Sequence, residues 1–160
     1  MERLIEFERR NLEASGATRA EVFSKIRKLS EFYALFLEQR RLPGAIVGER
    51  PDLASVWNDA PGHQYGRSAQ FLHQLQAIDP GSAWAAVKVP TLVLWGDADI
   101  VMHRADHERL ANIVNSNGAG LAQFHVIAGA DHGLVVRRPE GGPAFAARAV
   151  DLTLEFLRRL

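Results

Sequence analysis

Three polar side chains have the types and the spacing to work together in acid–base chemistry. Asp97 and Asp99 come directly after the apolar run 91–95, and His132 follows a second strand-like stretch, 121–128. Because adjacent parallel strands lie about 4.8 Å apart, we expect Asp99 and His132 to lie within hydrogen-bonding distance. A carboxylate bound to one imidazole nitrogen fixes the tautomer and leaves the other nitrogen free to act as a general base.

The run 91–95 predicts the strand that positions the two aspartates. It follows Pro90 and is continuously apolar, whereas a strand with one exposed face would alternate. We therefore expect it to be buried on both faces of a parallel sheet. Gly96 ends the run. Ligands of open α/β sheets bind beyond the carboxyl ends of such strands, and Asp97 and Asp99 lie at that point of the chain.

The C-terminal region, 87–160, predicts the order strand, helix, strand, helix. After the first strand, a helical pattern covers 103–115, an alternating strand pattern covers 121–128, and a last helix is expected from about Pro143 to the end. The residues expected to face inward from the first of these helices are Leu110, Ile113 and Val114. A right-handed connection would bring the two loops that follow the strands to the same end of the sheet.

Residues 1–86 predict a mostly helical region. A helix over 2–14 is followed by Gly16, a typical helix stop. Thr18 and Glu21 form a capping box ahead of a second helix, which is expected to reach a basic pair near residue 41. The apolar stripe of that helix is expected to be Val22, Ile26, Leu29, Tyr33 and Phe36.

Turn-forming residues interrupt the chain between the second helix and the first strand. Segment 42–67 is rich in proline and glycine, with room for one short helix over 51–57. Ser68 is a candidate N-cap for a third full helix over 69–78, and a short helical turn is expected over 82–86. The sequence therefore predicts an α/β chain in which a helical region precedes a small parallel sheet.

The composition excludes several classes of partner. The 160 residues carry nineteen basic and nineteen acidic side chains, which gives no indication of binding to nucleic acid or to an anionic membrane. No apolar run approaches the roughly 20 residues of a transmembrane helix, and the N-terminus lacks the apolar core of a signal peptide. Since there is no cysteine for a disulfide or a thiolate metal site, we expect a cytoplasmic protein.

A strand as apolar as 91–95 should have neighbours on both sides, yet the sequence offers only one other parallel strand. A two-stranded parallel sheet is not expected to be stable alone. We therefore expect the bare edge to be covered, either by helices of 1–86, by a missing N-terminal segment or by a dimer partner.

The C-terminal region resembles that of α/β-hydrolase-fold enzymes in two motifs, Val-Pro-Thr-Leu-Val-Leu-Trp-Gly-Asp-Ala-Asp at 89–99 and Gly-Ala-Asp-His-Gly-Leu at 129–134. In that family the second aspartate of the first motif is usually the catalytic acid, and the histidine of the last loop is the base. Carried over, these are Asp99 and His132. The resemblance implies the C-terminal βαβα portion of a hydrolase sheet at 87–160, preceded by a helical cap at 1–86, with serine aminopeptidase-like hydrolases as the nearest members.

Two parts of the family pattern are absent. No G-x-S-x-G nucleophile motif occurs; the nearest string, Gly-Arg-Ser-Ala-Gln at 66–70, lacks the second glycine and follows no predicted strand. A His-Gly-type oxyanion loop is also missing. Because both belong to the N-terminal half of such enzymes, we expect this chain to be the cap and C-terminal third of a larger serine hydrolase, inactive alone. The resemblance implies hydrolysis of an ester, amide or related bond, with no cofactor.

A small-molecule substrate is expected in a cleft under the cap. The aromatic residues that could line it are Trp57, Tyr65, Phe71 and Trp84. The alternative for each of them is a place in the core of the cap. Asp131, next to His132, is expected to shape the turn rather than to take part in the chemistry.

Three alternatives remain open. The pattern Asp-Ala-Asp-Ile-Val at 97–101 also fits phosphatases in which Asp97 attacks phosphate, but those enzymes need a later lysine and none follows Lys88. Both aspartates could instead be ordinary turn residues, and the chain could be a non-catalytic binding module of hydrolase ancestry. His103 and His107 have zinc-ligand spacing but lack the glutamate after the first histidine, so no metal site is expected.

Overall fold

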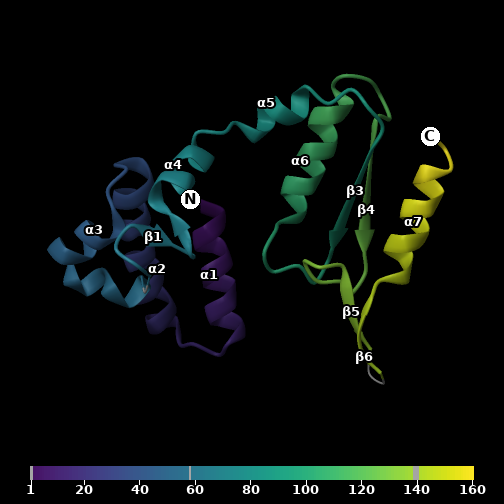
Figure 1. Cartoon of the computed structure of the whole chain (residues 1–160). Coiled ribbons are helices and arrows are strands. Elements are labelled where there is room, and N and C mark those ends of the chain that lie inside the picture. The colour runs from purple at the N-terminus through teal and green to yellow at the C-terminus, as the bar shows by residue number, and fades with distance from the viewer. Residues whose placement is uncertain (1, 58, 139–140) are drawn as a thin grey trace. The chain divides into compact units, whose positions relative to one another are not determined.

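The computed structural model describes residues 2–57, 59–138 and 141–160 (Figure 1). The chain forms two compact units, Met1–Ile78 and Asp79–Leu160, and each has a hydrophobic core of its own. The short helix α5 (Pro80–Ala85) belongs to the second unit. Among the described residues, no helix combines the length and the apolar character needed to cross a bilayer.

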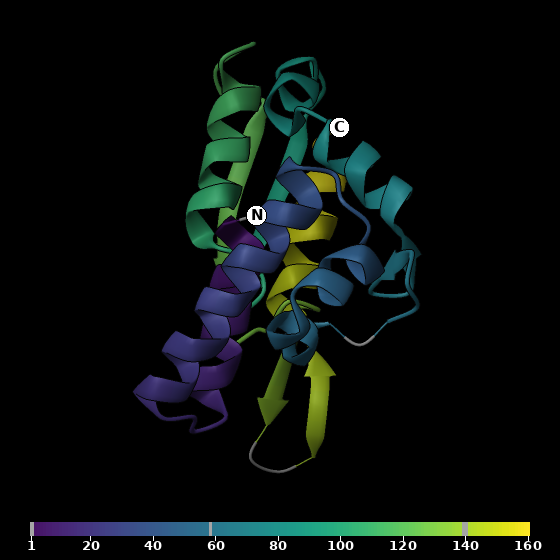
Figure 2. The ribbon, with the colours of Figure 1, turned by 90° about the vertical axis from the view of Figure 1, so that its left-hand side faces the viewer.

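The first unit is helical apart from one small hairpin. Its elements are α1 (Glu2–Ala14), α2 (Arg19–Tyr33), the π-helical turn η1 (Ala34–Glu38), α3 (Pro43–Glu49), the 3₁₀ helix η2 (Pro51–Val56), β1 (His63–Gln64), β2 (Arg67–Ser68) and α4 (Ala69–Gln76). The helices α1 and α2 pack against each other as a helical hairpin (Figure 2). Ser68 caps α4, as expected, with its hydroxyl accepting the Phe71 N–H at 3.2 Å.

The predicted capping box at the start of α2 is confirmed. The Thr18 side chain accepts the N–H of Glu21 at 3.3 Å, and the Glu21 carboxylate accepts the N–H of Thr18 at 2.8 Å. Hydrogen bonds from Thr18 hold the pKa of Glu21 below its usual value. Gly16 ends α1 in the left-handed conformation, at φ +81°, where an added side chain would be strained.

The predicted stripe of α2 forms much of the core of the first unit. Leu29, Tyr33 and Phe36 are buried, together with Phe32, Ile46 and Leu53 from the same cluster. Full burial of side chains of this size contributes about 1.5–3 kcal/mol each to folding. The second helix does not continue regularly to residue 41, however, because the backbone changes to a π-helical turn at η1.

Segment 42–67 is more ordered than its turn-rich composition predicts. Pro43, in the first helical turn, begins α3, and the close approach of Gly44 to Pro61 leaves no room for a side chain, since an added Cβ would lie 2.8 Å from the Pro61 Cβ. The hairpin of β1 and β2 turns at Tyr65 and Gly66, which both have positive φ. Tertiary packing thus overrides the weak helix propensity of the glycines.

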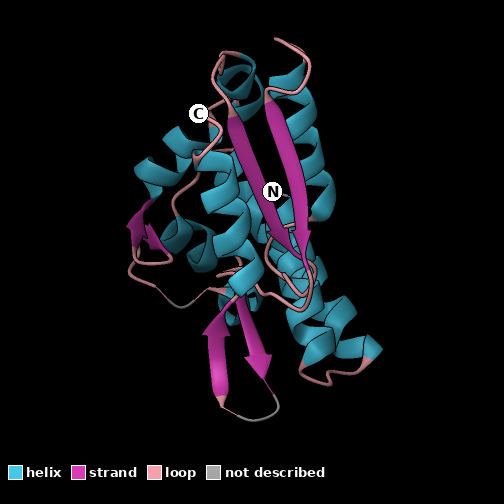
Figure 3. Ribbon diagram, turned by 90° about the vertical axis from the view of Figure 1, so that its right-hand side faces the viewer, coloured by secondary structure: helices cyan, strands magenta, loops and turns pink. Residues whose placement is uncertain are grey.

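The second unit is a mixed α/β structure around a parallel sheet of two strands. After α5 come β3 (Thr91–Gly96), α6 (Arg104–Asn115), β4 (Ala122–Ile127), β5 (Val135–Arg138), β6 (Gly142–Phe145) and α7 (Ala147–Leu157). Strands β3 and β4 pair in parallel from Thr91 opposite Ala122 to Gly96 opposite Ile127, and the two arrows point the same way in Figure 3. The two strands therefore end at the same level.

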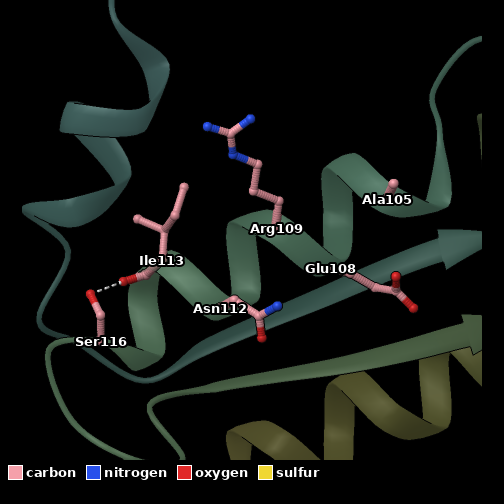
Figure 4. A pocket seen from close by; sticks show the side chains of 6 residues that line it. All are labelled: Ala105, Glu108, Arg109, Asn112, Ile113 and Ser116. Atoms are coloured by element: carbon pink, nitrogen blue, oxygen red, sulfur yellow. Dashed lines mark hydrogen bonds between the residues drawn. The ribbon is translucent and has the colours of Figure 1, made fainter.

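Both faces of this sheet are covered, as the apolar run predicts. Helix α6 packs Ala111 and Val114 against Val93 on one face, and α7 lies on the other face, where its Ala149 and Leu152 form a cluster with the β4 residue Ile127 (Figure 1). The expected inward position is correct for Val114 and partly so for Leu110. It is wrong for Ile113, which is half-buried and points away from the strands (Figure 4).

The prediction for the last helix is wrong at its start. Pro143 lies in β6, opposite Arg137 of β5, and α7 begins only at Ala147. Strands β5 and β6 pair antiparallel, and proline is tolerated there because an edge strand leaves backbone groups unpaired on one side. The C-terminal order is strand, helix, strand, hairpin and helix.

Candidate active site

The loops that follow β3 and β4 lie in direct contact at the carboxyl end of the sheet. Gly96 makes this possible, because a Cβ added there would lie 2.2 Å from the carbonyl oxygen of Ala130. The N–H of Ala98 donates to the same carbonyl oxygen at 3.0 Å. A glycine is therefore required where the β3 loop passes the β4 loop.

Asp97 and Asp131 hold the backbone of these loops. Asp97 Oδ1 accepts the N–H of Gly129 at 2.6 Å and so ties the first loop to the second. Asp131 Oδ1 accepts the N–H groups of Gly133 and Val135 at 2.9 and 3.0 Å. The prediction that Asp131 shapes the turn is confirmed, and both carboxylates fix the loop that carries His132.

Asp99 and His132 meet across the two loops. The distance from Asp99 Oδ2 to His132 Nδ1 is 3.0 Å, within hydrogen-bonding range. The other carboxylate oxygen, Oδ1, accepts the N–H groups of Val101 and Met102 at 2.7 and 2.9 Å. The Asp99 side chain is only 4% exposed, whereas that of His132 is 57% exposed. The acid is thus buried behind the histidine, and the ring is open to an incoming group.

The surroundings of Asp99 favour its ionised form. Burial on its own would raise the pKa, but the hydrogen bonds from Met102, His132 and Val101 together outweigh burial and hold the pKa below its ordinary value. An ionised carboxylate only accepts hydrogen bonds, so Nδ1 of His132 must be the donor. In the neutral ring the proton then sits on Nδ1, and Nε2 carries the lone pair that can accept a proton.

Three contributors to this geometry were not identified from the sequence. The indole N–H of Trp95 donates to the carbonyl oxygen of Met102 at 3.1 Å and holds the loop after β3. The backbone N–H groups of Val101 and Met102 then point at Asp99. The sequence does not show where backbone N–H groups point. The one available signal was Asp99 itself, because an aspartate in a turn often accepts a hydrogen bond from the backbone two residues further on.

The aromatic substrate candidates are divided between the two units. In the first unit, Trp57 packs against the core and donates its indole N–H to the His63 carbonyl oxygen at 2.9 Å. Tyr65 bonds to Tyr33, and the exposed Phe71 ring lies 5.9 Å from the Arg67 guanidinium. Trp84 belongs to the second unit, on α5. Each is placed within its own unit, and none of these contacts identifies a substrate.

The histidine pair with zinc-ligand spacing lies at the start of α6. His107 Nδ1 bonds to the carbonyl oxygen of His103 at 3.0 Å, which is a local helix contact. Across residues 2–57, 59–138 and 141–160, no group of three or more acidic, histidine or cysteine side chains is arranged to hold a metal ion.

A hollow of about 470 Å³ follows one side of α6. It is lined by Ala105, Glu108, Arg109, Asn112, Ile113 and Ser116. Figure 4 shows Arg109 and Ile113 extending away from the strands, and the Ser116 hydroxyl donating to the Ile113 carbonyl oxygen at 2.6 Å. Because its lining comes from a single helix and includes neither Asp99 nor His132, this hollow is a helix surface separate from the acid–histidine pair.

Comparisons with protein-family models, with curated proteins and with solved structures give no match for this chain. The described residues form a mixed α/β fold with a two-stranded parallel sheet.

Proposed function

We propose that the second unit supplies the acid and the histidine of an α/β-hydrolase-type catalytic triad, whose serine lies outside this sequence. The observation that supports this most is the 3.0 Å contact between Asp99 Oδ2 and His132 Nδ1, with the carboxylate buried and the ring exposed. The motif resemblance at 89–99 and 129–134 points the same way. The reaction class is hydrolysis of an ester, amide or related bond in a small molecule.

In this mechanism Nε2 of His132 takes the proton of the serine hydroxyl as the serine oxygen attacks the substrate carbonyl carbon. Asp99 stays ionised and stabilises the imidazolium that forms. When the tetrahedral intermediate collapses, Nε2 gives the proton to the leaving alcohol or amine. Water then attacks the acyl-enzyme with the same histidine as base, which releases the acid and restores the serine.

The remaining parts of the proposal depend on the resemblance. In the resemblance, residues 1–86 correspond to the helical cap, and Trp57, Tyr65, Phe71 and Trp84 stay candidates for substrate contact. The open edge of β3 would be covered by the segment that carries the serine or by a second copy of the chain. The cytoplasmic location stays a prediction.

The phosphatase alternative gains no support from the contacts of the two aspartates. Asp97, which would be the nucleophile of a phosphatase, accepts a hydrogen bond from the N–H of Gly129 with one of its two oxygens. Asp99, its acid–base group, is held by Val101, Met102 and His132. A phosphate-attacking carboxylate needs a nearby cation, and the last lysine of the chain is Lys88, before β3.

The first experiment measures the tautomer of His132 by ¹⁵N NMR in this chain. At a pH where the ring is neutral, the proposal requires a proton on Nδ1 and none on Nε2. In Asp99→Asn we expect the proton to move toward Nε2, because an amide can donate to Nδ1. Asp97→Asn is the matched control and should keep the tautomer. A neutral ring protonated on Nε2 in the unmodified chain would overturn the proposed role.

The second experiment looks for the serine with a fluorophosphonate probe. The probe is applied to this chain and to the longest polypeptide encoded in frame around it. We expect labelling of a serine in an upstream G-x-S-x-G motif, lost in His132→Ala. Labelling of one of this chain's own serines that depends on His132 would contradict an external nucleophile. Failure to label the longer polypeptide, or the absence of such a motif from it, would leave a non-catalytic binding module.

A further inference from the structure

The first unit contains a cavity of about 170 Å³ that is lined by neither Asp99 nor His132. Its apolar wall comes from α1, η1 and α4 and consists of Leu4, Phe36, Leu37, Leu72 and Leu75. An apolar cavity of about 150 Å³ is large enough to bind benzene. The volume therefore suits one compact molecule with a single six-membered ring or a chain of similar size.

A row of three polar groups forms one end of this cavity. Gln64, which is buried, donates its side-chain N–H to the Tyr33 hydroxyl at 3.0 Å. The Tyr33 hydroxyl lies 2.6 Å from the hydroxyl of Tyr65. All three residues line the cavity. Tyr33 is 2% exposed and Tyr65 is 56% exposed, so the row runs from the interior to the rim.

The burial of Tyr33 sets the direction of these hydrogen bonds. A buried hydroxyl proton needs an acceptor, and the oxygen of Tyr65 is the one that lies at 2.6 Å. If Tyr33 donates to Tyr65, its oxygen still accepts from Gln64 and both of its roles are filled. The proton of Tyr65 is then left at the exposed end of the row, available to an acceptor on a ligand.

The backbone of Tyr65 has an uncommon conformation for a residue of its size. Tyr65 has φ +55°, a left-handed conformation that is uncommon for a large residue and strained relative to glycine. The turn itself would be easier with glycine or asparagine at this position. The ring of Tyr65 nevertheless reaches Tyr33 at the edge of the cavity.

The lining of the cavity favours a neutral ligand. Burial, followed by the hydrogen bond with Tyr65, raises the pKa of Tyr33. None of the described residues that line the cavity is charged, so an ionised ligand would lose its hydration there without gaining a paired charge.

We propose that this cavity is a binding site for a neutral, compact apolar molecule with one hydrogen-bond-accepting oxygen, such as an aryl or short alkyl carbonyl compound. The apolar body lies against the leucines and Phe36, and the oxygen accepts the proton of Tyr65. The site lies wholly within the first unit, so the proposal does not depend on the hydrolase chemistry of the second unit.

The test is a titration of the full chain with three probes, in which binding is monitored by NMR chemical shifts. Acetophenone has the ring and the acceptor, ethylbenzene has the ring alone, and benzoate has a charged acceptor. We expect acetophenone to saturate with shifts at residues that line the cavity, and benzoate to bind at least threefold more weakly. Absence of saturable binding of acetophenone, or tighter binding of benzoate, would overturn the proposal.

Two variants separate hydrogen bonding from general apolar binding. Tyr65→Phe removes the terminal hydroxyl and should weaken acetophenone about three- to tenfold while leaving ethylbenzene unchanged. Leu75→Trp, at a half-exposed position of the wall, should weaken both probes more than tenfold. Leu42→Trp changes an exposed residue outside the cavity and should leave both unchanged. An equal loss for acetophenone and ethylbenzene in Tyr65→Phe contradicts the assigned acceptor contact.

Discussion

Tyr33 of the first unit and Asp99 of the second are both buried ionisable groups, and their surroundings favour opposite forms, neutral for Tyr33 and charged for Asp99. Tyr33 of the first unit is buried beside one amide and one hydroxyl, and burial raises its pKa. Asp99 of the second unit is also buried, but hydrogen bonds from Met102, His132 and Val101 outweigh burial and lower its pKa. Burial alone therefore does not decide the charge. A tyrosine is neutral and an aspartate ionised at about pH 7 in any case. The hydrogen bonds decide the direction in which each pKa moves, so the second unit stabilises the charged form of its group and the first unit the neutral form.

Removing the buried carboxylate of Asp99 should have the largest effect on the difference between the two units. In Asp99→Ala the N–H groups of Val101 and Met102 lose their acceptor. We expect the free energy of unfolding of the second unit to fall by about 3 kcal/mol, because each buried group left unsatisfied costs about 1–3 kcal/mol. Urea unfolding, monitored by tryptophan fluorescence, measures this free energy. A loss below about 0.5 kcal/mol would mean that the pair is not held as described.

Gly96→Ala should have the next largest effect. The added Cβ would lie 2.2 Å from the Ala130 carbonyl oxygen, so the two loops must separate. We expect a loss of about 2 kcal/mol and a weakened contact between Asp99 and His132, visible in the ¹⁵N shifts of the ring. Gly48→Ala is the control, since open space surrounds that position of α3. A thermal unfolding curve unchanged in Gly96→Ala contradicts the close loop contact.

Alkaline pH should destabilise the first unit through Tyr33. Its folded pKa is raised above its unfolded value of about 10. The stability from keeping the hydroxyl neutral is therefore complete below pH 10 or so and is lost above it, by about 1.4 kcal/mol per pH unit at most. The loss of stability is measured as the decrease in the α-helical circular dichroism signal as the pH is raised. Tyr33→Phe should be less stable at neutral pH but should lack this alkaline slope.

Acid should destabilise the second unit through Asp99. Its folded pKa is lowered below its unfolded value of about 3.9. The contribution is therefore complete above that value and is lost as the pH falls through the folded pKa, with a slope of about 1.4 kcal/mol per pH unit at most. Urea midpoints between pH 2 and pH 6 measure this. The slope should shrink in Asp99→Asn, and an unchanged slope would assign the acid sensitivity to other carboxylates.

The smallest expected change is at the start of α2. Thr18→Ala removes the acceptor of the Glu21 N–H and should lower the free energy of unfolding of the first unit by about 0.5–1 kcal/mol. Thr18→Ser keeps the acceptor and should stay close to the unmodified chain. If alanine and serine behave alike, the cap contributes nothing measurable.

Local signals in the sequence predicted the parts of the fold that depend on neighbouring residues. The capping box of α2, the stop at Gly16 and the cap at Ser68 are short-range hydrogen-bonding or steric features, and all three are present. Strand β3 could be predicted because a continuous apolar run indicates a strand that is covered on both faces. The meeting of Asp99 and His132 followed from two parallel strands that end at one level.

The parts that were missed depend on contacts with a partner segment and not on the residue type alone. Helix α3 places Gly44 against Pro61, and glycine does not favour a helix interior. The hairpin of β5 and β6 places Pro143 opposite Arg137, a pairing that Pro143 alone does not indicate. Tyr65 has a left-handed backbone, which residue type argues against. In each case the backbone conformation depends on the segment that the residue packs against or pairs with, and not on the propensity of the residue itself.

The register of the parallel sheet has a consequence for how the chain behaves in concentrated solution. The N–H groups of Thr91 and Asp97 point at β4, so by the alternation of a parallel ladder those of Leu92, Leu94 and Gly96 face the other way. Among the described residues no strand lies along that side of β3. An apolar strand edge that no described strand pairs with is a template for pairing with another chain, and we expect aggregation of this protein to begin there.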